Sequence, residues 1–264
     1  HLVPQWVAFV FMSAVTALTF SQAFKHNSLA VSFLGWAGGF LTPILLSTGR
    51  ANEVGLFTYI ALLDVGLLLI ILKKDSWVLL EPFTFAATYL MYLLWHLRFY
   101  TPADLSLTVF FLSIFWGLFY VLDLYRIVRS SYTFPEVRQP IATFNAVFYY
   151  IAVYAIVDPQ HHDWMGFTTV VIGAVYFLTI LAVKRRKVED KIVVARYLLT
   201  AIALLILATS IQFSGFKTVI WWSVEAMVLA WCGTRWNLRY VWISALGLFG
   251  IALIKLLVTK GSFS

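Results

Sequence analysis

The sequence predicts an all-α, polytopic transmembrane helical bundle of about ten spans, and its composition supports this fold class. Of the 264 residues, 62% are apolar, 18% are aromatic and only 12% are charged, and the mean hydropathy is +0.88. Soluble domains contain roughly 45–50% apolar and about 25% charged residues. The composition therefore excludes a soluble globule, a disordered chain, a coiled coil and a nucleic-acid-binding protein.

Each expected span is an apolar run long enough to cross a bilayer. A crossing helix needs about 20 residues, because the hydrocarbon core is roughly 30 Å thick and a helix rises 1.5 Å per residue. Charges, prolines and polar clusters separate ten such runs: 3–24, 29–47, 54–72, 77–97, 105–128, 141–157, 164–183, 195–211, 216–231 and 240–258. The connections are too short for a soluble domain. We therefore expect a single transmembrane domain over residues 1–264.

The Lys and Arg residues predict the orientation of these spans. With ten spans, fourteen of the 19 basic residues fall on one side and five on the other. Because basic residues collect on cytoplasmic loops, the richer side is expected to be cytoplasmic and both termini outside. This bias explains the pI near 9.5 without an anionic partner. The single cysteine, Cys232, excludes an internal disulfide and a cysteine-based metal site.

Two stretches of sequence resemble a known family. Residues 34–49 read LGWAGGFLTPILLSTG, and residues 218–235 read TVIWWSVEAMVLAWCGTR. They are similar to the LG-x-x-GGFL-x-P-x-LLS-x-G and W-x-x-EA-x-x-L-x-W-x-G signatures of the bacterial membrane protein family called domain of unknown function 2339. The resemblance implies a multi-pass protein of the bacterial inner membrane, and it brings no established reaction. Family members often carry Asn where this chain has Asp64, which departs from the pattern.

Family members are often longer, with more spans. The chain begins at His1, without a start Met or a cleavable leader. We therefore expect it to be part of a longer protein.

Glycine and proline residues in the second span form the first candidate site. Gly35, Gly38 and Gly39 precede Pro43 by one or two turns. Proline removes a backbone donor and clashes with the carbonyl four residues earlier. Interrupted helices of this kind supply free backbone groups to binding sites in transporters. The alternative is close helix packing, because Gly35 and Gly39 form a GxxxG pair.

Ionisable residues inside the spans form the second candidate site. Asp64 and Glu225 lie about ten and nine residues into the third and ninth spans. Both spans are expected to start on the outer side, so the two carboxylates should reach similar depths near the midplane. Lys255, near the outer end of the tenth span, could approach Glu225. Such groups are costly in hydrocarbon and often functional. The alternatives are a structural ion pair, a protonated acid bonded to a hydroxyl, or a lysine that snorkels outward.

Other polar residues are given structural interpretations. Asp123 and Arg126 have the i,i+3 spacing of a pair at a helix end. Glu81 precedes Pro82 and is expected in a first turn or at a kink. The stretch 158–163, DPQHHD, is expected to be an outer loop in which Asp163 caps the next span. Its adjacent histidines do not converge as zinc ligands do, so no metal or cofactor is expected.

The sequence favours binding or transport of a small or amphiphilic substrate, such as an ion or a lipid-linked envelope precursor. Glu225, Asp64, Lys255, Gly38, Gly39 and Pro43 are the candidate binding residues. The first alternative is a non-transporting subunit or scaffold of a larger complex. The second is an intramembrane transferase that acts on a lipid carrier, which is less favoured because the chain lacks nucleophile and phosphate-loop motifs. The expected partners are membrane lipids and other membrane subunits or further copies of the chain.

Overall fold

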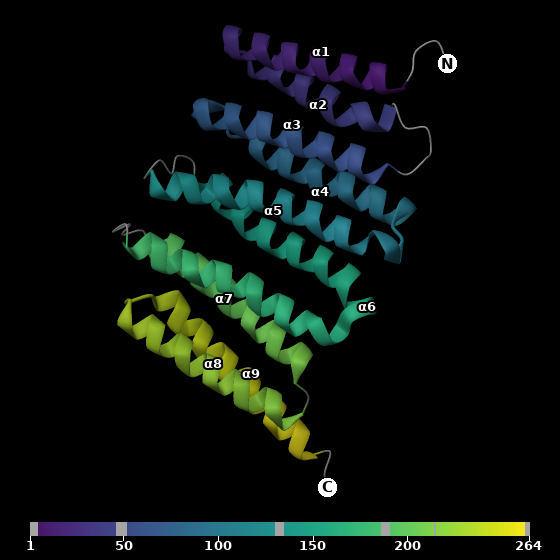
Figure 1. The fold of residues 1–264 in the computed structure, drawn as a ribbon. Helices are drawn as coiled ribbons and strands as arrows, with labels where there is room; N and C mark the ends of the chain where they lie inside the picture. The colour runs from purple at the N-terminus through teal and green to yellow at the C-terminus, as the bar shows by residue number, and fades with distance from the viewer. Residues whose placement is uncertain (1–4, 46–51, 130–134, 186–190, 214, 262–264) are drawn as a thin grey trace. The chain divides into compact units, whose positions relative to one another are not determined.

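The computed structural model describes residues 5–45, 52–129, 135–185, 191–213 and 215–261, and these are almost entirely helical (Figure 1). No strand occurs in these ranges. The helices are α1 (Gln5–His26), α2 (Leu29–Leu45), α3 (Glu53–Lys73), α4 (Leu80–Phe99), α5 (Leu105–Val128), α6 (Pro135–Arg185), α7 (Lys191–Gln212), α8 (Phe216–Arg235) and α9 (Arg239–Gly261). Short 3-10 turns at Asp75–Trp77 and Pro102–Asp104 precede α4 and α5.

Six segments of the described chain are long and apolar enough to cross a bilayer. They are Glu53–Lys73, Pro102–Val128, Val137–Pro159, His161–Leu181, Ile192–Gln212 and Arg239–Leu257. Helix α2 is apolar but shorter, and α1, α4 and α8 are helical where spans were expected but are not among the six. The all-helical fold class is therefore confirmed, and membrane-crossing length and composition are found for six of the ten expected spans.

At residues 158–163, where an outer loop was expected, two helices meet at a kink and are described together as α6. Helix α6 runs through this stretch with a kink at His161, whose backbone has φ −140° and ψ 53°. His162 Nδ1 and Asp158 Oδ1 lie 2.7 Å apart across one turn. The non-helical residue before the second of these helices is His161, so the cap predicted at Asp163, two residues later, is wrong. The described residues contain no group of three or more possible metal ligands.

The chain divides into two compact units. The first unit contains residues 1–126 and 132–149, and the second contains residues 127–131 and 150–264. Each unit includes a helical hairpin closed by an asparagine: Asn27 (φ 51°) follows α1 and Asn237 (φ 52°) follows α8. Asparagine tolerates this left-handed conformation, which ends a helix. The two hairpins, α1–α2 and α8–α9, are thus closed in the same way.

Helix α4 is central to the first unit. Its Trp95 packs against Phe57 of α3, whose ring also contacts Phe111 and Phe115 of α5. On another face of α4, Phe85 packs against Phe119 and Phe148, which belong to α5 and α6. Edge-to-face and tilted contacts of this kind favour fixed ring positions. The aromatic contacts join four helices around a core into which polar groups are inserted at a few points.

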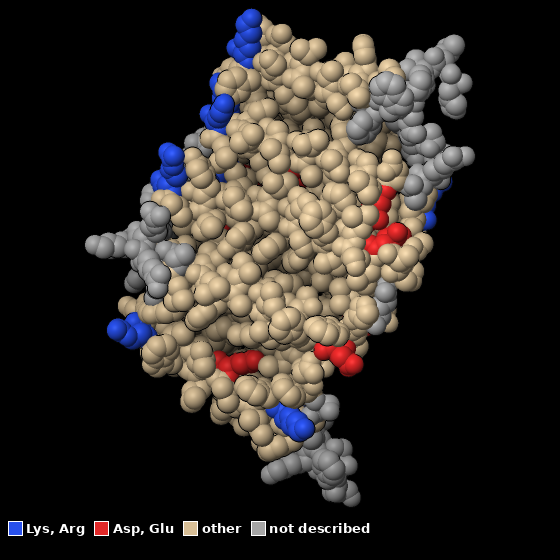
Figure 2. Space-filling model, in the orientation of Figure 1, with Lys and Arg blue, Asp and Glu red and all other residues tan. Residues whose placement is uncertain are grey.

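The surface is dominated by exposed apolar side chains. Figure 2 shows a face that is almost entirely uncharged, with a few Lys, Arg, Asp and Glu side chains. Leu97 is 74% exposed and Leu34 is 72% exposed, and large exposed apolar residues occur on every helix. Contact of so much apolar surface with water is unfavourable. This surface is suited to lipid.

Candidate functional site

The second unit contains a cavity of about 630 Å³ between the second half of α6, α7 and α8. Its volume falls within the roughly 300–1,000 Å³ of typical ligand sites. The polar residues in its wall are Asp163, Thr209, Gln212 and Glu225. The apolar and aromatic residues are Gly166, Phe167, Val170, Ile202, Leu205, Ala208, Phe213, Trp221, Val224 and Val228. The cavity is therefore mostly apolar with a small number of polar groups.

Glu225 is one of the two ionisable residues that line this cavity, the other being Asp163. Glu225 is half-buried, and its Oε2 atom is buried without a hydrogen-bond partner among the described residues. The Thr209 hydroxyl faces the carboxyl group, but the Ile206 carbonyl lies 2.9 Å from the same hydroxyl. A hydroxyl has one proton to donate. The carboxyl group therefore has room for a further donor from a bound molecule.

Aromatic rings lie in the wall near Glu225. Phe213 and Trp221 stack with centroids 5.7 Å apart and planes 14° apart, and both line the cavity together with Phe167. The faces of aromatic rings attract cations. A carboxylate and aromatic faces in one apolar cavity form a combination suited to a lipophilic cation.

Lys255 belongs to the second unit but does not line this cavity. Its Nζ atom lies 4.4 Å from the centroid of the Trp222 ring, three residues before Glu225. Lys255 therefore lies near the same helix as Glu225, with an aromatic face as one of its contacts. The predicted role of Lys255 in substrate binding stays a prediction.

Asp64 is buried in the first unit, between α3 and α4. It has no exposed surface, and the Thr88 hydroxyl lies 2.9 Å from both of its carboxyl oxygens. Thr88 Oγ1 is also 2.9 Å from the Thr84 carbonyl. Asp64 does not line the cavity beside Glu225. This arrangement matches the structural alternative of an acid bonded to a neighbouring hydroxyl.

Pro43 lies in the last turn of α2 without interrupting the helix. Because proline has no N–H, the carbonyl of Gly39, four residues earlier, loses its usual helical donor. The Tyr59 hydroxyl of α3 donates to this carbonyl at 2.9 Å. The Gly39 carbonyl, which an interrupted helix would leave free to bind a ligand, is thus hydrogen-bonded within the protein.

The glycines of α2 differ in their surroundings. A Cβ at Gly39 would lie 3.0 Å from Leu63 of α3 and 3.2 Å from Thr16 of α1, whereas a Cβ at Gly38 would meet nothing within 4 Å. A Cβ at Gly35 would lie 3.1 Å from Thr19. Gly35 and Gly39 therefore allow close helix packing, the alternative that the GxxxG spacing suggested.

We expect Tyr59→Phe to lower the free energy of unfolding by about 1–3 kcal/mol, because it leaves the buried Gly39 carbonyl without a donor. In a Pro43→Ala background the helix supplies its own donor, so the loss should be about 1 kcal/mol smaller. Denaturant unfolding of the four proteins in mixed micelles measures this coupling. Equal losses in both backgrounds would show that Tyr59 does not replace the missing proline donor.

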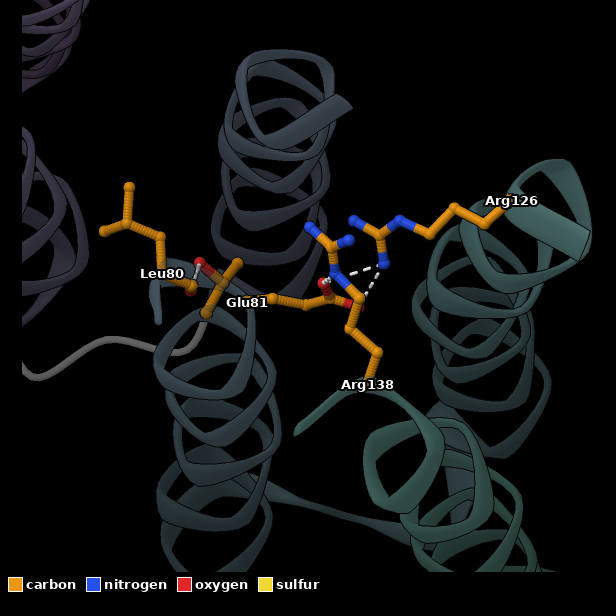
Figure 3. A network of polar contacts seen from close by, with 5 residues as sticks. Leu80, Glu81, Arg126 and Arg138 are labelled. Atoms are coloured by element: carbon orange, nitrogen blue, oxygen red, sulfur yellow. Dashed lines mark hydrogen bonds and ion pairs between the residues drawn. The ribbon is translucent and has the colours of Figure 1, made fainter. Parts of the chain in front are cut away.

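A buried charge cluster in the first unit was not predicted (Figure 3). Arg126 Nη1 of α5 donates to both carboxyl oxygens of Glu81 of α4 at 2.7 Å, and Arg138 Nε of α6 lies 3.4 Å from Glu81 Oε2. The three side chains are at most 5% exposed. Sequence reasoning considered Arg126 only with Asp123, its neighbour along the helix. The signal it missed is that Glu81, Arg126 and Arg138 all lie at the same end of consecutive spans.

These features define the class of the protein: a helical membrane protein with an acidic cavity in one unit and a buried charge cluster in the other. A family model described as "Predicted membrane protein (DUF2339)" matches residues 1–258. The chain therefore belongs to this family, as its two signatures suggested. The searches of curated proteins and of solved structures return no match for the chain.

Proposed function

We propose that this membrane protein binds a small amphiphilic molecule with a cationic head group in the cavity beside Glu225. The observation that carries the proposal is the Glu225 Oε2 atom, which is buried at the cavity wall without a donor from the described chain. A carboxylate left unpaired in a low-dielectric site is costly. A ligand that donates N–H groups or carries positive charge would remove this cost.

The remaining wall of the cavity favours an apolar tail on the ligand. Most of its residues are aliphatic or aromatic, and they extend along α7 from Gln212 to Ile202. The ten residue-to-residue steps from Ile202 to Gln212 correspond to roughly 15 Å of helix. An alkyl chain can occupy this length while the head group contacts Glu225 and the rings of Phe213 and Trp221.

We further propose the bacterial inner membrane as the location, with both termini outside. Basic residues gathered at one end of the first unit support this orientation. Lys74 Nζ donates to Asn27 Oδ1 at 3.0 Å, so the end of α3 and the α1–α2 turn lie at the same end of this unit. Lys25 and Lys73 lie in the last turns of α1 and α3. Basic residues at one end are typical of the cytoplasmic side. With this topology, Asp163 and Gln212 lie toward the outer end of the cavity.

We expect purified protein to bind dodecylammonium, and Glu225→Gln to weaken this binding about tenfold or more, a loss of about 1.4 kcal/mol. Native mass spectrometry of the protein titrated with dodecylamine in maltoside micelles measures the affinity. The substitution keeps the shape of the side chain and removes its charge. Asp158→Asn is the control, because it removes an acidic charge near the α6 kink from a residue outside the cavity wall.

Binding of neutral 1-dodecanol, measured in the same experiment, distinguishes an effect of the Glu225 charge from an effect of the cavity volume. Its binding should change less than twofold in Glu225→Gln, since the cavity keeps its volume. Equal affinities of dodecylammonium for the wild-type and Glu225→Gln proteins would refute the proposed role of Glu225.

A further inference from the structure

A second hollow, in the first unit, is a groove of about 820 Å³ between α1 and α3. It is independent of Glu225 and of the proposed cationic ligand. Ser13, Thr16, Ala17, Phe20, Ser21 and Phe24 line it from α1. From α3 the lining extends from Val54 to Lys73 and includes Leu62, Gly66 and Leu69. The groove therefore follows nearly the full length of α3.

The lining of the groove is apolar along most of its length. Phe20 and Leu67 are buried in it, whereas Leu62 and Leu69 are 67% and 53% exposed. A Cβ added at Gly66 would meet nothing within 4 Å. The groove is thus open at the surface of a segment long and apolar enough to cross a bilayer, where lipid chains are the surrounding solvent.

One end of the groove carries positive charge. Lys73 is exposed and lines it, and Lys25 lies in the last turn of α1. Figure 1 shows α1 and α3 ending at the same side of the first unit. Lys74 lies 5.1 Å from the ring of Phe24, itself a lining residue. The lining contains no Asp or Glu, so this end of the groove complements an anion.

We infer that the α1–α3 groove binds an anionic phospholipid, with the phosphate at Lys73 and one acyl chain lying along α3. Half of a hydrocarbon core of about 30 Å is roughly 15 Å, or about ten helical residues. A chain that starts at Lys73 therefore extends to about Leu63. Gly66 lies on this path, where its missing side chain leaves space for the lipid.

The test compares lipid retention from nanodiscs made of equal parts of phosphatidylglycerol and phosphatidylcholine with matched acyl chains. Native mass spectrometry of released protein counts the lipids that stay bound. The wild-type protein should retain phosphatidylglycerol in preference to phosphatidylcholine. Lys73→Gln should reduce this preference about fivefold, the effect of one lysine near an anionic lipid. Gly66→Trp should reduce retention of both lipids, because the indole fills the groove.

Two control variants make similar changes in the second unit. Lys217→Gln removes an exposed lysine from α8, and Gly247→Trp adds an indole to α9 at a glycine with open space around it. Both should retain phosphatidylglycerol as the wild type does. Unchanged retention in Lys73→Gln and Gly66→Trp would overturn the inference. A lipid-free dimer of the wild-type protein that Gly66→Trp converts to a monomer would also overturn the inference, because a second copy of the chain would then occupy the groove.

Discussion

Glu81→Gln is expected to lower the free energy of unfolding by about 3–5 kcal/mol, because it removes the charge of the carboxylate that two buried arginines contact. Arg126 and Arg138 both contact this carboxylate, and their side chains are 4% and 1% exposed. Neither guanidinium loses its charge when its partner is removed. Reversible unfolding of the purified protein in mixed micelles measures the loss.

Joint replacement of the cluster tests the cause of this loss. Buried ion pairs are costly to desolvate, so apolar residues of similar size often replace a whole cluster without loss of stability. The triple variant Glu81→Leu, Arg126→Met and Arg138→Leu should therefore recover at least half of the stability that Glu81→Gln removes. A Glu81→Gln protein as stable as the wild type would show that Glu81 does not hold the two arginines in place.

Gly233→Ala is expected to be the second most damaging single change, with a loss of about 3 kcal/mol. A Cβ at this position would lie 2.8 Å from the backbone nitrogen of Trp242 and 3.0 Å from its Cα atom. Both atoms belong to the backbone of α9, which cannot rotate away as a flexible side chain can. The Leu238 amide also donates to the Gly233 carbonyl at 2.8 Å, so a shift would disturb the α8–α9 turn.

The control for Gly233→Ala is the same change at Gly247 of α9, where a Cβ would meet nothing within 4 Å. Because alanine has a higher helix propensity than glycine, Gly247→Ala should keep or slightly raise the free energy of unfolding. The two variants are compared by unfolding in mixed micelles. Equal stabilities of the two variants would contradict the close approach of α8 and α9 at Gly233.

Hydropathy predicted the helices well, because the length of an apolar run determines where a helix can cross lipid. The run 54–72 is found as α3 (Glu53–Lys73), and the run 105–128 coincides with α5. The stretch 158–163 was interpreted as a loop because of its polar residues. The structure has a kink there, and His161 is the residue that departs from helical geometry between the two helices.

The candidate site was predicted in part. The cost of a carboxylate in hydrocarbon drew attention to Glu225, which lines a cavity, and to Asp64, which is bonded to Thr88. Sequence alone does not distinguish these cases, because the outcome depends on whether the neighbouring helices enclose the carboxyl group, as at Asp64, or leave a cavity beside it, as at Glu225. The contacts of Tyr59 with Gly39 and of Glu81 with Arg126 join residues 20 and 45 positions apart. Such pairings depend on tertiary packing, which hydropathy does not report.

A density map of the protein in lipid nanodiscs with dodecylammonium tests the central claim most directly. The account predicts elongated density between α6, α7 and α8, with its amine within hydrogen-bonding distance of Glu225 and its tail beside Ile202 and Leu205. An empty, collapsed space around Glu225, or a carboxyl group fully bonded by its own chain, would contradict the account.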